Sequence, residues 1–343
     1  MPHQILRLSH NCRPRSMASE LAIPIWPSGT HPLDLIVAWL ARRSKLFSPG
    51  WGDEEIFARL SDRSSYSAPP SSIVLNWGAC VDHRGIARRD GTFLSPLQLL
   101  PESSRTVHVR SWTGVGHEAA CVFLAASRDE GFRLREHVFG GLSERRFDLY
   151  FLENPFYGAR RRLQGPTQMT VSDQGLMALG MVLEARALVE NLRLQYQKLL
   201  VAGYSMGGHM AAITAAVTPF ALGCAALATG ASASSIYTRG LLSWSVDFDA
   251  LVDQPGSRTS AKARLAQLFD VADLTRYPLP ARPQATVIAG CKRDGYVFSS
   301  ETERLHQHWK GSTLRWIPGG HFSALITRRR ALCDCIEEVA HRL

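Results

Sequence analysis

A Gly-x-Ser-x-Gly pattern at residues 203–207 constrains the fold of this chain more than any other segment. The apolar run 199–202 before it predicts a strand, and the small-residue run from 206 to about 216 predicts a helix. The turn that joins this strand to this helix is tight enough to strain the serine, and glycines two residues to either side remove the Cβ atoms that would clash. The hydroxyl of Ser205 is then lifted clear of the sheet as a candidate nucleophile. The competing interpretation is a packed turn whose serine only caps the helix.

A serine nucleophile needs a histidine to accept its proton and a carboxylate to orient that histidine. Both follow Ser205 in the order Ser, Asp, His that accompanies this type of turn. Asp294 comes just after a predicted buried strand at 285–290, and His321 lies in a Gly-Gly-His loop after a last predicted strand at 313–317. Active-site groups gather beyond the carboxyl ends of the strands in open α/β sheets, so we expect these side chains to meet there.

Other acids and histidines also follow Ser205 in the chain. The rival acids, none of which directly follows a convincing strand, are Asp247, Asp249 and Asp273. The rival histidines, for which a surface position is the default expectation, are His306, His308 and His341. An acid at position 294 could also simply end a strand.

A site that attacks carbonyl groups also needs two N–H donors for the oxygen that becomes charged. One donor is expected to be the backbone N–H of Met206, directly after the nucleophile. The second comes from the loop after an earlier strand, which by position is the run 121–125. Ala126 or its neighbour would then supply it.

The chain resembles the α/β-hydrolase-domain-containing protein 18 family in five phrases, in order, from about residue 33 to the C-terminus. They are residues 45–52 (Lys-Leu-Phe-Ser-Pro-Gly-Trp-Gly), 90–96 (Asp-Gly-Thr-Phe-Leu-Ser-Pro), 152–158 (Leu-Glu-Asn-Pro-Phe-Tyr-Gly), 203–210 (Gly-Tyr-Ser-Met-Gly-Gly-His-Met) and 319–324 (Gly-Gly-His-Phe-Ser-Ala). The resemblance implies an ester hydrolase acting on lipid acyl esters. The family's expected triad falls on Ser205, Asp294 and His321.

Two departures from the family pattern bear on the site. Where the family is similar to Leu-Ala-Gly-Thr-Gly-Asp, residues 124–129 read Leu-Ala-Ala-Ser-Arg-Asp, so Ala126 and Arg128 replace glycines. If either position needs a positive φ, the loop is strained or rebuilt, which puts the second N–H donor in doubt. The long insert of animal members is nearly absent, and the short segment 256–284 predicts a small or absent lid.

Two functional hypotheses follow. In the first, Ser205 attacks an acyl ester with His321 as base and Asp294 orienting the imidazole, and no metal or organic cofactor is needed. In the second, the chain is a catalytically impaired α/β-hydrolase that acts as a binding or scaffold protein. The second hypothesis predicts that Ser205 lies beyond hydrogen-bond reach of His321.

The fold class follows from the alternation of strand and helix patterns, which predicts an α/β fold with a mostly parallel sheet of about eight strands and helices on both faces. We assign residues 33–343 to one α/β-hydrolase domain with an N-terminal helical extension, and residues 1–32 to a tail. The earlier elements predicted are strands at 71–80, 106–112 and 147–152, a hairpin near Asp90-Gly91, and a helix at 171–191.

The tail and the cysteines bear on location. The first nineteen residues contain Arg7, Arg13 and Arg15 and no acid, which is typical of a mitochondrial presequence; an unstructured basic tail is the alternative. Seven scattered cysteines without a Cys-x-x-Cys metal pattern favour a reducing compartment, hence an intracellular protein, mitochondrial or cytoplasmic. No run of eighteen apolar residues exists, so we predict no membrane span.

The net charge of +9 bears on partners. It indicates either an anionic partner, such as phospholipid headgroups, or a codon bias toward arginine. No nucleic-acid motif is visible and the arginines are dispersed, so no nucleic-acid partner is predicted. Residues 33–47 form a helix-like stretch with a tryptophan and a basic patch, which either lies on an anionic membrane surface or packs on its own domain. The pattern leaves the oligomeric state open.

Overall fold

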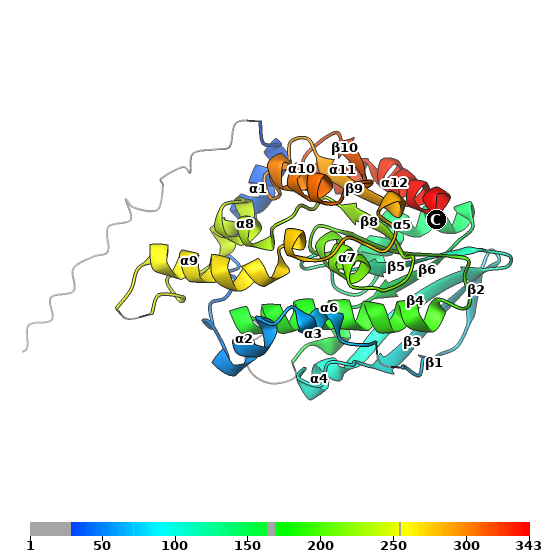
Figure 1. The fold of residues 1–343 in the computed structure, drawn as a ribbon, viewed down its shortest axis with the longest axis horizontal. Helices are drawn as coiled ribbons and strands as arrows, with labels where there is room; N and C mark the ends of the chain where they lie inside the picture. The colour runs from blue at the N-terminus through cyan, green and yellow to red at the C-terminus, as the bar shows by residue number, and fades with distance from the viewer. Residues whose placement is uncertain (1–28, 71, 163–168, 254) are drawn as a thin grey trace, which may run out of the picture.

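The computed structural model describes residues 29–343 except 71, 163–168 and 254 (Figure 1). The predicted presequence therefore lies outside the described residues. The described strands form a ten-stranded sheet in the order β1-β3-β4-β6-β5-β7-β8-β9-β10, with β2 paired to β3. The strands are β1 Asn76–Trp77, β2 Val81–His83, β3 Ile86–Leu94, β4 Thr106–Gly114, β5 Ala119–Leu124, β6 Phe147–Leu152, β7 Lys198–Tyr204, β8 Gly223–Leu227, β9 Thr286–Cys291 and β10 Thr313–Ile317.

The sheet is parallel from β6 through β5, β7, β8 and β9 to β10, and antiparallel where β4 meets β6 and where β3 meets β4. Every residue of β5, β6, β8 and β9 is buried. Such strands read as continuous apolar runs because helices cover both of their faces. The predicted fold class is therefore confirmed, with eight longer strands and two short ones.

The hairpin predicted near Asp90-Gly91 is wrong. Strand β3 runs unbroken through both residues and pairs with β4 along its whole length. The turn lies instead at Arg84-Gly85, between β2 and β3, where both residues have positive φ (57° and 81°). Gly91 serves packing: a Cβ there would lie 2.5 Å from the ring of Trp77 on β1. The strand predicted at 71–80 is reduced, among its described residues, to β1.

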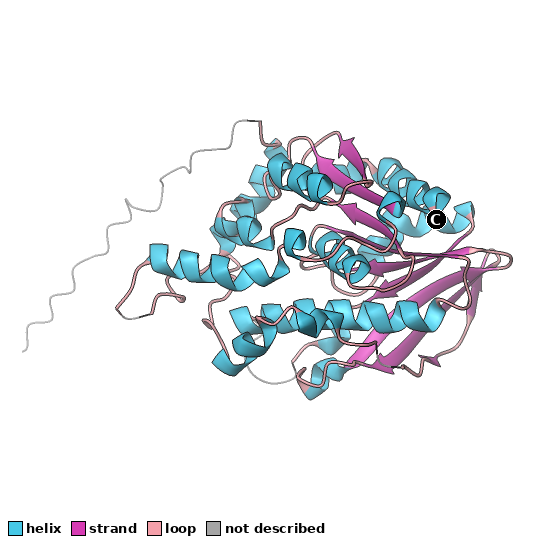
Figure 2. Ribbon diagram, viewed as in Figure 1, coloured by secondary structure: helices cyan, strands magenta, loops and turns pink. Residues whose placement is uncertain are grey.

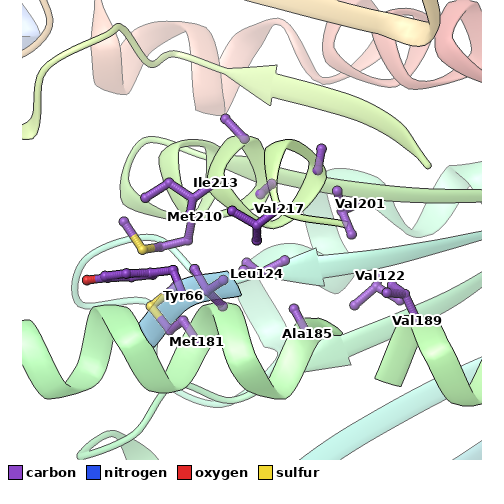
Figure 3. Close-up of a cluster of buried hydrophobic side chains, with 14 of the residues drawn as sticks. Tyr66, Val122, Leu124, Met181, Ala185, Val189, Val201, Met210, Ile213 and Val217 are labelled. Atoms are coloured by element: carbon purple, nitrogen blue, oxygen red, sulfur yellow. The ribbon is translucent and has the colours of Figure 1, made fainter. Parts of the chain in front are cut away.

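Helices pack on both faces of the sheet (Figure 2). One face is covered by α6 (Val171–Leu192), α7 (Met206–Ala216) and α10 (Ser299–His308). The other face is covered by α5 (Arg133–Phe139) and α12 (Arg329–Arg342). Helix α6, predicted at 171–191, starts at a capping box in which Thr170 and Asp173 satisfy each other's backbone N–H. Figure 3 shows its side chains Met181 and Ala185 below Met210 and Ile213 of α7.

A small cap lies beside the carboxyl edge of the sheet, in line with the predicted small lid. Between β8 and β9 the chain forms α8 (Ala233–Thr238) and α9 (Arg258–Phe269), which pack together with α2 (Glu54–Leu60). The remaining described elements are short: α3 Ser64–Ser67, α4 Glu102–Arg105, α11 His321–Thr327, and the 3₁₀ turns η2 Gly140–Arg145, η3 Gly158–Arg160, η4 Leu241–Ser245, η5 Asp270–Ala272, η6 Leu274–Arg276 and η7 Pro283–Ala285.

The helix-like stretch predicted at 33–47 is shorter than expected. Helix α1 spans Pro32–Ala41, with the His31 side chain accepting the N–H of Leu33 at its start. The chain must leave the helix because Leu46 pairs with Val246 in an isolated bridge. The inner side of α1 is packed on the domain through Ala38, which is 1% exposed. Packing on its own domain, one of the two predicted roles, is therefore confirmed for this side.

The cysteines of the described part of the chain are free, and Cys121, Cys224 and Cys291 are buried in strands. Among the described residues, no helix combines the length and the apolar character needed to cross a membrane.

Candidate active site

The tight strand-to-helix turn predicted around Ser205, a nucleophile elbow, is present between β7 and α7. Ser205 has φ 57° and ψ −122°, a strained conformation for a residue with a side chain. A Cβ at Gly203 would lie 2.2 Å from the carbonyl carbon of Gly207, and a Cβ at Gly207 would lie 2.2 Å from the Leu124 oxygen. Only glycine fits at either position. The Ser205 side chain makes no capping bond to α7, so the interpretation of Ser205 as a simple helix cap is wrong.

Ser205, Asp294 and His321 come together at the carboxyl ends of β7, β9 and β10. The Ser205 Oγ lies 2.9 Å from His321 Nε2, and His321 Nδ1 lies 2.7 Å from Asp294 Oδ2. The histidine side chain is 6% exposed and the aspartate side chain is 1% exposed. In the tautomer that satisfies both contacts, Nδ1–H donates to the carboxylate and Nε2 accepts the serine hydroxyl.

The rival residues with described partners are engaged elsewhere. The contacts are Asp249 with Arg258, Asp273 with Arg304 at 2.9 Å, His306 with the Ser312 hydroxyl at 2.9 Å, and His308 with the Tyr277 carbonyl at 3.3 Å. None of these contacts involves Ser205.

The orientation of the Asp294 carboxylate is set by its own loop. Its Oδ1 accepts the backbone N–H groups of Tyr296, at 2.7 Å, and Val297, at 2.9 Å. The second oxygen, Oδ2, is thereby left facing His321. Backbone donors of this kind stabilise the ionised carboxylate that the histidine needs as its partner.

Sequence reasoning missed a second carboxylate beside the triad. Asp34, on α1, is fully buried, and its Oδ2 accepts the N–H groups of Gly295 (3.1 Å) and His321 (2.8 Å). Its Oδ1 accepts the N–H of Phe322 at 3.0 Å. The one available signal was a lone acid inside an otherwise apolar helical stretch, because a buried carboxylate must have partners.

Several neighbours set the basicity of His321. The rings of Tyr204 and Tyr296 lie 5.3 and 5.1 Å from the imidazole, and the Tyr204 hydroxyl donates to the His321 carbonyl at 2.6 Å. Burial disfavours the imidazolium, but the charge and hydrogen bond of Asp294 and the charge of Asp34 outweigh it. Together they raise the pKa of His321 above its ordinary value.

The loop predicted to hold the second oxyanion donor places a non-glycine residue in a strained conformation, one of the two outcomes expected from the replaced glycines. Arg128 stands where the family has glycine and has φ 64°. Its N–H donates to the Tyr157 hydroxyl at 3.1 Å, and its guanidinium donates to the Ser44 carbonyl and hydroxyl, each at 3.2 Å. These contacts offset the roughly 1 kcal/mol that a left-handed residue costs.

The two residues at the start of this loop face different spaces. Ser127 lines the same pocket as Ser205 and Met206, whereas Ala126 lines a separate small pocket with Leu124 and Tyr204. Met206 is the first residue of α7, where backbone N–H groups have no partner within the helix. Of the predicted pair, Ala126 or its neighbour, the neighbour Ser127 is the one that shares a pocket with Ser205.

Two neighbouring pockets share the lining residues Ser127, Gln174 and Tyr237, and Ser205 lines the inner one. The inner pocket is lined mainly by apolar side chains, among them Phe57, Leu60, Met210, Ala233, Ile236, Leu268 and Phe269. The cationic residues that line the outer pocket are Lys45, Arg128, Arg161 and Arg162, with Glu130 and Tyr157 beside them.

Within the described residues, no three or more His, Cys, Asp or Glu side chains are grouped as metal ligands would be.

Known proteins share both the sequence pattern and the fold. The family model described as alpha/beta hydrolase domain containing 18 matches residues 44–262 and 255–342. Similar solved structures include acetyl xylan esterase 1 from Thermoanaerobacterium sp., at 15% identity and a TM-score of 0.52 over 86% of this chain and 98% of that chain. An S-formylglutathione hydrolase from Agrobacterium tumefaciens and a cold-adapted esterase from an Arctic intertidal metagenomic library are each 14% identical, with TM-scores of 0.51 over 78% of this chain and 99% of theirs. At these identities the likeness shows a shared fold.

The contact between Asp294 and His321 predicts a measurable shift. In an NMR pH titration, with the signal assigned by its loss in His321→Gln, the His321 imidazole should titrate above the ordinary value of about 6.5. In Asp294→Asn it should titrate at lower pH, because the imidazolium loses its nearest counter-charge. An unchanged titration in that variant would contradict a direct contact between the two side chains.

Proposed function

The chain belongs to the alpha/beta hydrolase domain containing 18 family, and on this premise we propose that it is a serine hydrolase that cleaves carboxylic esters, with lipid acyl esters as substrates. The observation that carries the proposal is the hydrogen-bonded chain from Ser205 Oγ through both ring nitrogens of His321 to Asp294. A nucleophile, a base and an orienting carboxylate in this relation are what acyl transfer requires.

The reaction would proceed through an acyl-enzyme. Ser205 Oγ attacks the acyl carbonyl carbon while its proton passes to His321 Nε2, and Asp294 stabilises the imidazolium that forms. The N–H of Met206 and an N–H of the 126–127 segment would stabilise the oxyanion. His321 then protonates the departing alcohol oxygen. A water molecule, deprotonated by the same nitrogen, releases the acid and restores the Ser205 hydroxyl.

The scaffold hypothesis predicted that Ser205 lies out of reach of His321, and the separation of 2.9 Å counts against it. The altered sequence of residues 126–129 was its main support. That loop is held by the Arg128 contacts and by the buried ion pair between Asp129 and Arg135, at 2.8 Å. Such bracing is consistent with a loop kept in one geometry for catalysis.

The substrate class is argued from the two pockets. Ser205 lines the inner pocket, whose apolar walls suit an acyl chain, and burial of such a chain is favourable by about 0.8 kcal/mol per methylene. The outer pocket shares lining residues with the inner one and would offer its cationic side chains to the alcohol portion of the ester. Long apolar acyl groups and an anionic headgroup would satisfy both, which favours a phospholipid-like ester over a small neutral one.

A fluorophosphonate probe tests the proposed mechanism. The purified protein should be labelled at Ser205, and Ser205→Ala should abolish labelling, because the probe reacts with an activated serine. Ser312→Ala is a matched control, since Ser312 also contacts a histidine at 2.9 Å but lies outside the elbow, and it should keep full labelling. A folded wild-type protein that is not labelled would refute the mechanism.

Chain-length preference tests the inner pocket. Ala233→Phe should fill part of it and lower kcat/KM for a long-chain ester by about tenfold or more, with a smaller effect on an acetate ester. Ala263→Phe is the control, because Ala263 lies exposed on α9 and does not line the pocket. Equal losses on both esters in Ala233→Phe would show that the acyl chain binds elsewhere.

For the outer side of α1 we propose contact with an anionic membrane surface. Ile36, Trp39 and Leu40 are 55%, 44% and 55% exposed and recur at helical spacing. The guanidinium groups of Arg42 and Arg43 lie 5.0 and 5.7 Å from the Trp39 ring. Apolar side chains beside arginines suit the headgroup region of an anionic bilayer. The segment directly after α1 lines the outer pocket, so this contact would place the pocket near its lipid.

Vesicle sedimentation tests this surface. The protein should bind vesicles of phosphatidylcholine with phosphatidylglycerol more tightly than pure phosphatidylcholine, and less tightly at high salt. Trp39→Ser should weaken binding by about tenfold. Leu194→Ser, 90% exposed on the loop before β7 at the opposite sheet edge, should leave it unchanged. Equal binding by all three proteins would exclude α1 as the contact.

A further inference from the structure

The N-terminal segment runs along both loops that carry the base and its carboxylate. The His31 N–H donates to the Arg293 carbonyl at 2.9 Å, and the Arg293 side chain donates to the Gly29 carbonyl at 3.0 Å. One turn later, Asp34 reaches the loop after β9 and the loop after β10 together. Segments more than 250 residues apart in sequence are thus joined beside the triad.

The Asp34 carboxylate is buried, and within residues 29–343, as far as they are described, its hydrogen-bonding partners include no cation. Its hydrogen bonds come from three backbone N–H groups, of Gly295, His321 and Phe322. Burying an ionised carboxylate is costly unless such donors compensate it. Donors on two separate loops can converge on one carboxylate only if the loops keep a fixed distance. The contact therefore favours one relative position of the Asp294 loop and the His321 backbone.

We propose that Asp34 is a positioning residue for the triad: through the backbone N–H groups of Gly295 and His321 it holds the loop of Asp294 and the base His321 in register. The proposal rests on the proposed serine hydrolase function. It concerns a residue outside the family match, which begins at residue 44.

The close approach of α1 to the His321 loop supports this role. Gly320 lies directly before the histidine, and a Cβ there would be 2.6 Å from Asp34 Oδ2 and 2.4 Å from the His31 Cβ. Its φ of −100° is open to any residue, so glycine is required here for space. On the other side, the Tyr204 hydroxyl holds the His321 carbonyl. The histidine backbone is thus held at its N–H by α1 and at its carbonyl by β7.

The groups that face the His321 imidazole determine how a charge change at Asp34 would affect its protonation. They are Asp294 from the β9 loop, Asp34 from α1, Ser205 from the elbow, and the phenols Tyr204 and Tyr296, both of whose pKa values burial raises. Asp34 and Asp294 are the two carboxylates in this described set. Removing the charge of Asp34 would leave Asp294 as the single counter-charge of the imidazolium.

The test is the rate of fluorophosphonate labelling of Ser205 as a function of pH, in wild type and Asp34→Asn. The variant should label on the order of ten- to a hundredfold more slowly, because small displacements of a base are costly. The acidic limb of its pH–rate profile, where labelling falls as His321 is protonated, should move to lower pH, because loss of the Asp34 charge favours the neutral imidazole. A residue needed only for stability would lower the melting temperature without moving that limb.

Asp148→Asn is the matched control. Asp148 is also a buried carboxylate with several hydrogen bonds, from the Gly114 N–H, the Tyr196 hydroxyl and His117, but it lies near the start of β6, at the opposite edge of the sheet. Asp148→Asn should lose stability but keep the acidic limb of the wild-type pH–rate profile. The proposal would be overturned if Asp34→Asn kept the wild-type labelling rate and the wild-type acidic limb of the pH profile. It would also be overturned if both variants lost rate equally and neither shifted that limb.

Gly320→Ala is a second variant in case Asp34→Asn does not fold. It keeps the carboxylate but forces α1 and the histidine loop apart, so labelling should slow although the charge remains. Wild-type labelling in this variant would overturn the proposal. If wild type itself is not labelled, the proposed function fails instead, and an NMR titration still decides about Asp34: His321 should titrate at lower pH in Asp34→Asn, and an unchanged titration would refute the contact.

Discussion

The turn at Ser205 is the constraint on which the rest of the site depends. The backbone of Gly207 lies so close to Gly203 and Leu124 that neither glycine position admits a Cβ. This contact locks α7 onto the ends of β5 and β7 and leaves the serine with a positive φ. The strain is tolerated because the parallel sheet and two helices over-determine the position, as the Ser205 N–H bond to the Leu227 carbonyl illustrates. A hydroxyl held in this way points to the carboxyl edge of the sheet.

Around this turn, buried polar groups stabilise loops that have little regular structure of their own. Asp294 is oriented by its own loop, Asp34 joins that loop to His321, and Arg135 binds Asp129 together with the carbonyls of Phe123 and Leu152. Each charged group has several partners, which makes its burial tolerable. The same pattern holds Arg128 in a conformation that glycine would adopt freely. Side-chain contacts thus replace backbone freedom in the loop after β5.

The pockets arise from parts of the chain that are far apart in sequence. The inner pocket combines α2, α6, α7, α8 and α9, and the outer pocket combines the segment after α1 with the loops after β5 and β6. The inner pocket, which Ser205 lines, has mostly apolar walls, and the outer pocket, which shares Tyr237 with it, carries cationic side chains, so the two ends of the site are unlike. This asymmetry is the physical basis for proposing an amphipathic ester, because each end would match one part of such a molecule.

The sequence by itself determined the elbow, the alternation of strands and helices, and the order of Ser205, Asp294 and His321. These are local properties: glycine spacing, apolar periodicity and the position of a polar residue after a strand are all visible along the chain. Even so, the sequence pattern wrongly predicted a turn at Gly91. A glycine is needed there because a Cβ would clash with the ring of Trp77 on the neighbouring strand.

Only the tertiary structure decided the contacts of Asp34, the different pockets that Ala126 and Ser127 line, and the composition of those pockets. Asp34 lies 287 residues before His321, and nothing local marks it as a partner of that residue. Such contacts depend on how helices and loops close around the sheet. Their energies come from burial and from hydrogen bonds between distant segments, which a local pattern does not encode.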